Sequence, residues 1–179
     1  MKTLEEIRDS IPVYARDLQL NLGSVLSTSG APGLAENQIW SVALACAIAA
    51  RNGSFARDIE VLAATRLSPE ELAAAHAAVA IMGMNNIYYR FLHLVDDAEY
   101  KTLPVRLRMN VLGSPGIDKK DFELMALAVS AINGCGTCVA SHERVLRQHG
   151  LTREAVQSAV RIAAVINAVA GVLEHERKR

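Results

Sequence analysis

The residues best suited to chemistry in this sequence are Cys135-Gly136-Thr137-Cys138 and His142, four positions further on. Thiols three positions apart on a helix share one face, and a residue four positions later lies one turn along that face. The two thiols can therefore close a disulfide, and the histidine can accept a thiol proton. In a chain with 3 cysteines, such a Cys-x-x-Cys pair indicates a redox site.

Two structural interpretations of the pair stay open at this point. Both cysteines could be small buried residues, or they could join His142 as zinc ligands, although no second Cys/His cluster offers a fourth ligand. The remaining cysteine, Cys46, stands among alanines and a leucine and is expected to be a buried core residue.

Glu123 is the acid that a folded chain would bring closest to His142. On one straight helix it would lie about 18 Å along the axis from Cys135, too far for proton transfer. Asn133-Gly134 is a turn dipeptide, and a turn there would fold the segment into a helical hairpin. We therefore expect a Glu123–His142 contact, direct or through one water, in a relay in which His142 deprotonates Cys138. The alternative is that Glu123 is a solvated acid on a helix surface.

Two features favour ionisation of a thiol. Cys135 is expected in the first turn of its helix, where free N–H groups and the helix dipole stabilise an anion, and Cys138 has His142 at i+4. The residues alone slightly favour Cys135 as the more readily ionised thiol. Exposure, which a sequence does not report, decides which of the two reacts.

The surrounding sequence predicts an all-α protein, rich in alanine, valine and leucine and with 4% aromatic residues. Trp40 is expected in the core, and the stretch 82–89, with its methionines and tyrosines, in the core or a subunit interface. Loops are predicted at 27–33 and 96–116, and a solvated tail at 174–179. The predicted helices cover 4–26 with a break near Pro12, 36–50, 54–65, a long helix opened by the capping box Ser68-Pro69-Glu70-Glu71, 118–132, 135–148, and a last helix starting at Thr152–Ala155.

An internal repeat organises these helices into one domain, 1–179, with similar halves at about 36–95 and 118–175. A constant shift of 84 places the capping box at Ser68 on Thr152. Because the match is mostly alanine and aliphatic residues, coincidental helix periodicity is the alternative.

The same shift compares the two halves at the candidate site. Arg51, Ser54 and Asp58 fall on the two cysteines and the histidine. Only the second half carries the thiols, so the first half is expected to be scaffold.

Composition excludes several classes of function. Charged residues make up 21% of the 179 residues and the formal net charge is +0, so no basic stripe for nucleic acid is present. The acidic start lacks a signal peptide's apolar run, and no window looks like a membrane span. We expect a cytoplasmic protein, where disulfides are transient and catalytic.

Several segments resemble the alkyl hydroperoxide reductase D family, and the resemblance covers nearly the whole chain. Its most specific part is the Glu…Cys-x-x-Cys-x-x-x-His core. The family belongs to a wider carboxymuconolactone-decarboxylase-like group of all-helical, oligomeric proteins, which implies a homotrimer. The segments that carry the resemblance are Gly83–Arg90 (GMNNIYYR), Leu107–Asn110 (LRMN), Pro115–Ile117 (PGI), Phe122–Leu124 (FEL) and Ala128–Cys135 (AVSAINGC), followed by Cys138, His142 and Glu143.

The resemblance implies an antioxidant thiol peroxidase and disulfide reductase with no tightly bound cofactor or metal. Cys138 would attack the peroxide and become a sulfenic acid, and Cys135 would supply a proton and then resolve it to the disulfide. His142 and Glu123 match the family's proton relay. Electrons would come from dihydrolipoyl groups on a lipoylated acyltransferase, recharged from NADH by dihydrolipoamide dehydrogenase, and could pass to a peroxiredoxin.

One position departs from the family pattern. Several members carry a histidine immediately before the second cysteine, and here Thr137 stands there. A hydroxyl cannot act as a base at neutral pH, so a slower peroxidase or a shifted pH profile is expected. Two other functions stay open: a decarboxylase-like enzyme that does not need the thiols, and an electron-relay adaptor whose own peroxidase rate is incidental.

Overall fold

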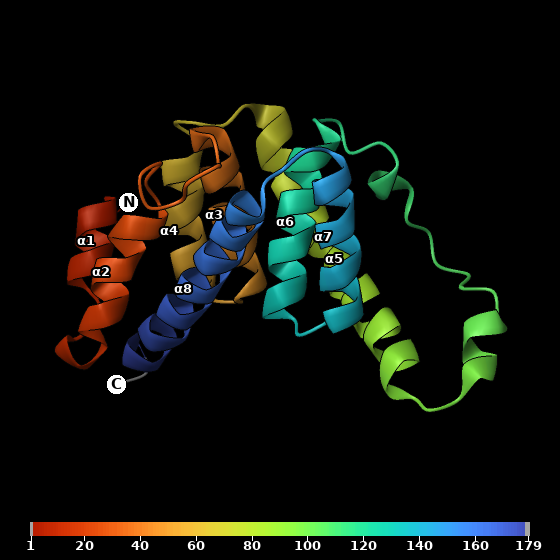
Figure 1. The fold of residues 1–179 in the computed structure, drawn as a ribbon. Coiled ribbons are helices and arrows are strands. Elements are labelled where there is room, and N and C mark those ends of the chain that lie inside the picture. The colour runs from red at the N-terminus through yellow and green to blue at the C-terminus, as the bar shows by residue number, and fades with distance from the viewer. Residues whose placement is uncertain (1, 178–179) are drawn as a thin grey trace.

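The computed structural model describes residues 2–177, in which all the regular elements are helices and no strand is present (Figure 1). The all-α prediction is therefore confirmed. Short 3₁₀ turns cover Val13–Ala15, Ala98–Thr102 and Asn110–Leu112. The α-helices are α1 (Leu4–Asp9), α2 (Arg16–Val25), α3 (Glu36–Ala49), α4 (Gly53–Ala63), α5 (Pro69–Leu94), α6 (Lys119–Ile132), α7 (Gly136–Gln148) and α8 (Arg153–Arg177).

Most helix ends follow the predicted signals. Ser68 and Glu71 form the expected capping box at the start of α5, with Pro69 in the first turn. The chain breaks at Pro12 between α1 and α2, as predicted. The predicted tail was wrong in part, because α8 continues to Arg177, while residues 178–179 lie outside the described part of the chain.

Helix α3 lies at the centre of the core. It packs against α4, α5, α6 and α8 and is buried on every face, as a helix that is apolar all round must be. Trp40 and Cys46 are 3% and 0% exposed, which confirms both predictions. Burial raises the pKa of the Cys46 thiol, so this cysteine stays neutral and unreactive.

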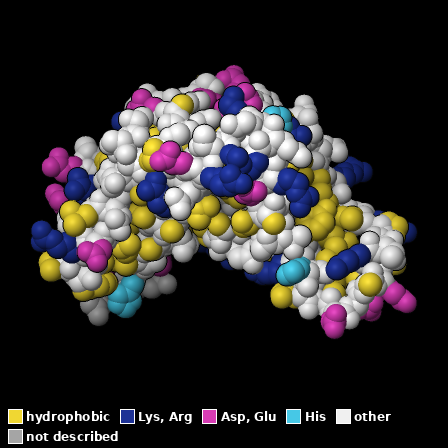
Figure 2. All heavy atoms as spheres, in the orientation of Figure 1, with side chains coloured by type: hydrophobic (Ala, Val, Ile, Leu, Met, Phe, Trp, Pro, Cys, Tyr) yellow, Lys and Arg dark blue, Asp and Glu magenta, His cyan; other side chains and the backbone are white. Residues whose placement is uncertain are grey.

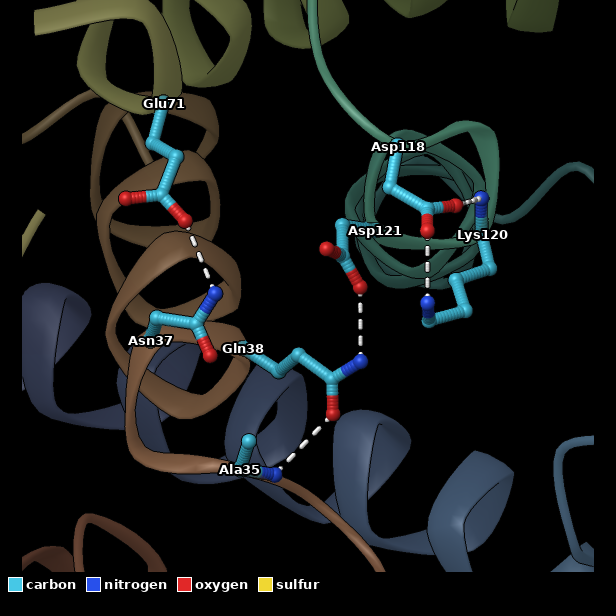
Figure 3. A network of polar contacts seen from close by, with 7 residues as sticks. All are labelled: Ala35, Asn37, Gln38, Glu71, Asp118, Lys120 and Asp121. Carbon is cyan, nitrogen blue, oxygen red and sulfur yellow. Dashed lines mark hydrogen bonds and ion pairs between the residues drawn. The ribbon is translucent and has the colours of Figure 1, made fainter. Parts of the chain in front are cut away.

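Polar contacts join the start of α3 to two other helices (Figure 3). The Gln38 side chain accepts a hydrogen bond from the Ala35 backbone N–H at 3.0 Å and donates to Asp121 of α6 at 2.6 Å. Asn37 donates to Glu71 of α5 at 2.8 Å. These contacts set the relative position of α3, α5 and α6, and α6 carries Glu123.

Corresponding helices in the two halves begin at a nearly constant separation. Helices α3 and α6 start 83 residues apart (119 − 36), α4 and α7 83 apart (136 − 53), and α5 and α8 84 apart (153 − 69). The duplication itself stays a prediction. For the helix that carries the thiols the shift is 83 rather than 84, so the pairing with Arg51, Ser54 and Asp58 was wrong by one position.

The shift of 83 also matches the local geometry before α4 and α7. Asn52 and Cys135 are both N-caps whose side chains accept a hydrogen bond from the backbone N–H three residues later. Each follows a residue with positive φ, 63° at Arg51 and 70° at Gly134. Counted from the helix starts, Trp40, Phe55 and Ile59 therefore occupy the places of Glu123, Cys138 and His142.

Helix α8 corrects one expectation. It is 25 residues long and contains a stretch of mean hydropathy 1.7, which was not expected from the sequence. By length and composition the helix is therefore long and apolar enough to cross a membrane. In the structure it packs against α2, α3 and α6, and its buried residues include Ile162, Ile166 and Val169. Helix α8 is packed as a core helix.

Residues 95–117, here called the arm, extend away from the helical body after α5 and return to α6 (Figure 1). Ile87, Phe91 and Leu94 lie on one face of the outer half of α5 and are 63%, 46% and 72% exposed. Leu103 in the arm is 56% exposed. Figure 2 shows hydrophobic side chains gathered on the side where α7 faces the arm. This apolar surface is unusually exposed for a single chain.

Candidate active site

A tight turn between α6 and α7 builds the site, as the Asn133-Gly134 dipeptide predicted. Gly134 has φ 70°, a conformation that favours glycine, and its N–H donates to the Ala131 carbonyl at 3.1 Å. The Cys135 N–H donates to the Ser130 carbonyl, also at 3.1 Å. The turn places Cys135 at the start of α7 and aligns that helix beside α6.

Helix α5 holds this turn through a chain of side-chain hydrogen bonds. Arg90 donates to the Asn133 carbonyl at 2.6 Å, and the Asn133 amide donates to Asn86 at 2.9 Å. Asn86 in turn donates to the Ser130 hydroxyl at 2.8 Å. Sequence reasoning assigned none of these residues to the site. Asn133 was predicted only as part of the turn. The other three stood, without an assigned role, in the segments that resemble the family.

The two cysteines form a disulfide, with an S–S distance of 2.10 Å and Cα atoms 5.3 Å apart. The prediction that the pair can close a disulfide is confirmed. Cys135 is the N-cap of α7 rather than a residue of its first turn, and its sulfur accepts the Cys138 N–H at 3.3 Å. Both are buried, Cys135 at 0% and Cys138 at 6% exposed.

Glu123 and His142 meet across the hairpin, as predicted. Glu123 Oε2 lies 2.6 Å from His142 Nδ1, and the two side chains are 8% and 12% exposed. The interpretation of Glu123 as a solvated surface acid was wrong. A buried carboxylate bonded to one ring nitrogen orients the imidazole and leaves Nε2 to exchange a proton.

A cavity of about 340 Å³ opens beside the second thiol, between α5, α7 and the arm. Cys138 and His142 line it, whereas Cys135 does not. The other lining residues are Met82, Tyr89, Met109 and Leu112, which give it apolar walls, and Asn85, Thr137 and Ser141, which are polar.

The stretch 82–89 therefore has a role beyond the expected core or interface. Met82 is buried, as predicted, but its side chain and that of Tyr89 form cavity walls. The Tyr89 hydroxyl donates to the Met109 sulfur at 3.7 Å, which connects α5 to the arm. Sequence alone could not find this cavity, because its walls come from segments far apart in the chain.

Within residues 2–177, no three His, Cys, Asp or Glu side chains are grouped so that they could hold a metal ion. His142 is bonded to Glu123, and the two sulfurs are bonded to each other.

These features define a class of protein: all-helical, with a Cys-x-x-Cys disulfide at a helix start and a carboxylate–histidine pair beside it. Comparison with known proteins identifies the family. The chain is 53% identical to proteins named alkyl hydroperoxide reductase AhpD from Streptomyces avermitilis, Rhodospirillum centenum and Maricaulis maris. The alignments cover 97% of this chain and 96%, 92% and 99% of those relatives.

The second half of the chain also matches a broader family. Residues 98–175 match the carboxymuconolactone decarboxylase family, and this segment contains the disulfide, Glu123 and His142. The chain belongs to the alkyl hydroperoxide reductase D (AhpD) family.

Proposed function

We propose that this protein is a cytoplasmic antioxidant thiol peroxidase that reduces organic hydroperoxides with Cys138 and Cys135. The observation that carries the proposal is that Cys138 lines an apolar cavity together with His142, while Cys135 lies behind it. A peroxide that enters the cavity meets Cys138 first. Exposure thus favours Cys138 over Cys135 as the attacking thiol, and the names of the relatives support the same activity.

The reaction begins with the reduced pair. His142 takes the Cys138 proton, and the thiolate attacks the outer oxygen of the hydroperoxide. An S–O bond forms, the O–O bond breaks, and the departing alkoxide takes the Cys135 proton to become an alcohol. The Cys135 thiolate then displaces hydroxide from the sulfenic acid, and His142 returns its proton to give water. Two thiols and one hydroperoxide yield a disulfide, an alcohol and water.

The geometry suits each thiol to its step. The sulfur of Cys135 accepts a backbone N–H at the N-terminus of α7, where the helix dipole stabilises negative charge. This environment supports the Cys135 thiolate after its proton has left. Glu123 holds His142 in place and stabilises its protonated form.

Turnover needs a two-electron reductant for the disulfide. We propose a dihydrolipoyl group on a lipoylated acyltransferase, which is recharged by dihydrolipoamide dehydrogenase from NADH. We propose that the reduced protein can pass these electrons either to a hydroperoxide or to a peroxiredoxin. Peroxide turnover measured with and without a purified peroxiredoxin distinguishes a self-sufficient peroxidase from an electron-relay adaptor.

Thiol counting tests the proposed function. Pre-reduced protein receives one equivalent of cumene hydroperoxide, and free thiols are counted in denaturant before and after addition of dihydrolipoamide. We expect the loss of two thiols per chain and their recovery. Cys138→Ser should not react, while Cys46→Ala, the matched control, should react like the wild type. Retention of all thiols in the wild type would exclude the peroxidase.

A decarboxylase-like activity is the second candidate, because the matching family model carries that name. The double variant Cys135→Ser with Cys138→Ser separates the two functions. Only a thiol peroxidase loses all activity in this variant.

We also propose that the protein assembles as a homotrimer. The exposed face formed by Ile87, Phe91 and Leu94, together with the arm, is the surface that such an assembly would cover. Sedimentation equilibrium of the wild type should give three times the chain mass. Leu94→Glu should lower that mass, whereas a monomeric wild type would contradict the proposal.

A further inference from the structure

Asn85 is the polar residue of the cavity whose buried amide oxygen has no hydrogen-bond partner among the described residues. It lies on α5, its side chain lines the cavity beside Cys138 and His142, and it is 4% exposed. A buried amide without a partner destabilises a fold, so its presence beside a reactive group needs a reason.

The neighbouring residue Asn86 makes the hydrogen bonds that stabilise this part of the fold, so a structural role does not explain Asn85. Asn86 is 1% exposed, donates to Ser130 and accepts from Asn133. Asn86 therefore holds the turn before Cys135, and Asn85 takes no part in that chain of hydrogen bonds. The two adjacent side-chain amides therefore have different surroundings, and only the Asn85 side chain lines the cavity.

The chemistry of the amide matches the head of a hydroperoxide. An asparagine side chain offers one acceptor oxygen and two N–H donors. An R–O–O–H group offers one donor, on its outer oxygen, and acceptor lone pairs on both oxygens. As placed, the amide can donate an N–H to the inner oxygen, on which negative charge develops as the O–O bond breaks. Its buried oxygen can accept the O–H once the amide group rotates about its last side-chain bond.

We infer that Asn85 is a substrate-binding residue that holds the –OOH group of the hydroperoxide for attack by Cys138. This inference rests on the proposed peroxidase function. Tyr89 and Met109 on the cavity walls take the organic substituent, while Asn85 recognises the head that all hydroperoxides share.

The test uses the reduced full-length protein and two variants with opposite effects on cavity volume. Asn85→Leu keeps the branched shape without polar atoms, and Asn85→Ala enlarges the cavity. Stopped-flow mixing measures the rate constant for thiol oxidation by cumene hydroperoxide and by hydrogen peroxide. A parallel measurement follows modification of Cys138 by methyl methanethiosulfonate, which needs the thiolate but has no –OOH group.

Both variants should lose at least about tenfold in rate with both peroxides. Their reaction with the thiosulfonate should stay within about twofold of the wild type, because thiolate formation depends on His142. Equal losses in both reactions, or none, would overturn the role of Asn85 while leaving the peroxidase function intact. A wild-type protein that reacts with the thiosulfonate but with neither peroxide would overturn the proposed function and this inference together.

Discussion

The Glu123 carboxylate lies 2.6 Å from the imidazole of His142, although 19 positions separate the two residues in the sequence. The contact exists because the turn at Gly134 reverses the chain and places α6 beside α7. It leaves one histidine nitrogen bonded and the other able to exchange a proton with a group in the cavity.

Replacement of Glu123 by glutamine tests this relationship. Glu123→Gln keeps the size and hydrogen-bonding capacity of the side chain but removes the charge that stabilises a protonated His142. We expect the rate constant for oxidation by cumene hydroperoxide to fall by about 100-fold, measured by stopped flow. An unchanged rate in a folded variant would show that His142 acts without the carboxylate.

A substitution at Thr137 is expected to raise the rate of oxidation by peroxide rather than lower it. Thr137 is exposed, lines the cavity and precedes Cys138. Thr137→His adds a second base near the attacking thiol, so the oxidation rate at pH 7 should rise by about tenfold. Thr137→Gln, which has similar bulk but no base, is the control. Equal rates in both variants would mean that a base at this position takes no part in the proton relay.

The two glycines beside Cys135 should respond differently to alanine. Gly134 has positive φ, so Gly134→Ala should lower the free energy of unfolding by about 1 kcal/mol. Gly136 begins α7 without positive φ, and an added Cβ would meet no atom within 4 Å. Gly136→Ala should therefore raise stability by about 0.5 kcal/mol. Urea unfolding gives both values, and similar effects at both positions would contradict the turn geometry.

The adjacent asparagines of α5 form a second matched pair. Asn86→Leu leaves Ser130 and Asn133 without their buried partner, so it should cost about 2 kcal/mol or more in urea unfolding. Asn85→Leu removes an amide oxygen that has no partner, so it should change stability by less than about 1 kcal/mol or increase it. Equal costs would show that Asn85 has a structural role.

Asp118, the N-cap of α6, should make stability depend on pH. The Lys120 side chain and then its backbone N–H hydrogen-bond to Asp118 and lower the pKa of that carboxyl. A lowered folded-state pKa adds stability above the unfolded-state value, and this contribution is lost as pH falls through the folded-state value. Asp118→Ala should cost about 1 kcal/mol at pH 7.

The cost of Asp118→Ala should shrink as the pH falls from about 5 to about 3. Lys120→Met should cost less than Asp118→Ala, because the ion pair is half-exposed and screened by solvent. Urea unfolding at several pH values provides the comparison. A cost independent of pH would mean that the carboxylate charge contributes nothing.

Local sequence signals predicted the parts of the site that lie within one stretch of chain. The thiol spacing, the turn dipeptide and the positions of Glu123 and His142 on either side of it defined the hairpin. The helix order followed from periodicity and capping residues. These signals work because they depend on backbone geometry over a few turns.

The rest of the site depends on contacts between distant segments. Met109 reaches the cavity from the arm, and Asn86 meets Ser130 across 44 positions. Periodicity on α5 could not separate Asn85, which lines the cavity, from Asn86, which bonds to α6, because the difference comes from what each side chain meets after packing. The shift of the repeat was also one residue off at α7, because the starts of α7 and α8 are 17 residues apart (153 − 136), whereas those of α4 and α5 are 16 apart (69 − 53).

In the first half, Trp40, Phe55 and Ile59 occupy the places of Glu123, Cys138 and His142, and all three are at most 3% exposed. The place of Cys135 is taken by the N-cap Asn52. The first three places thus hold closely packed apolar and aromatic side chains in the first half, and ionisable side chains beside a cavity in the second half. Stability and reactivity make opposite demands on a core. This chain separates them in space, so its first half offers a place to strengthen the protein without touching the chemistry.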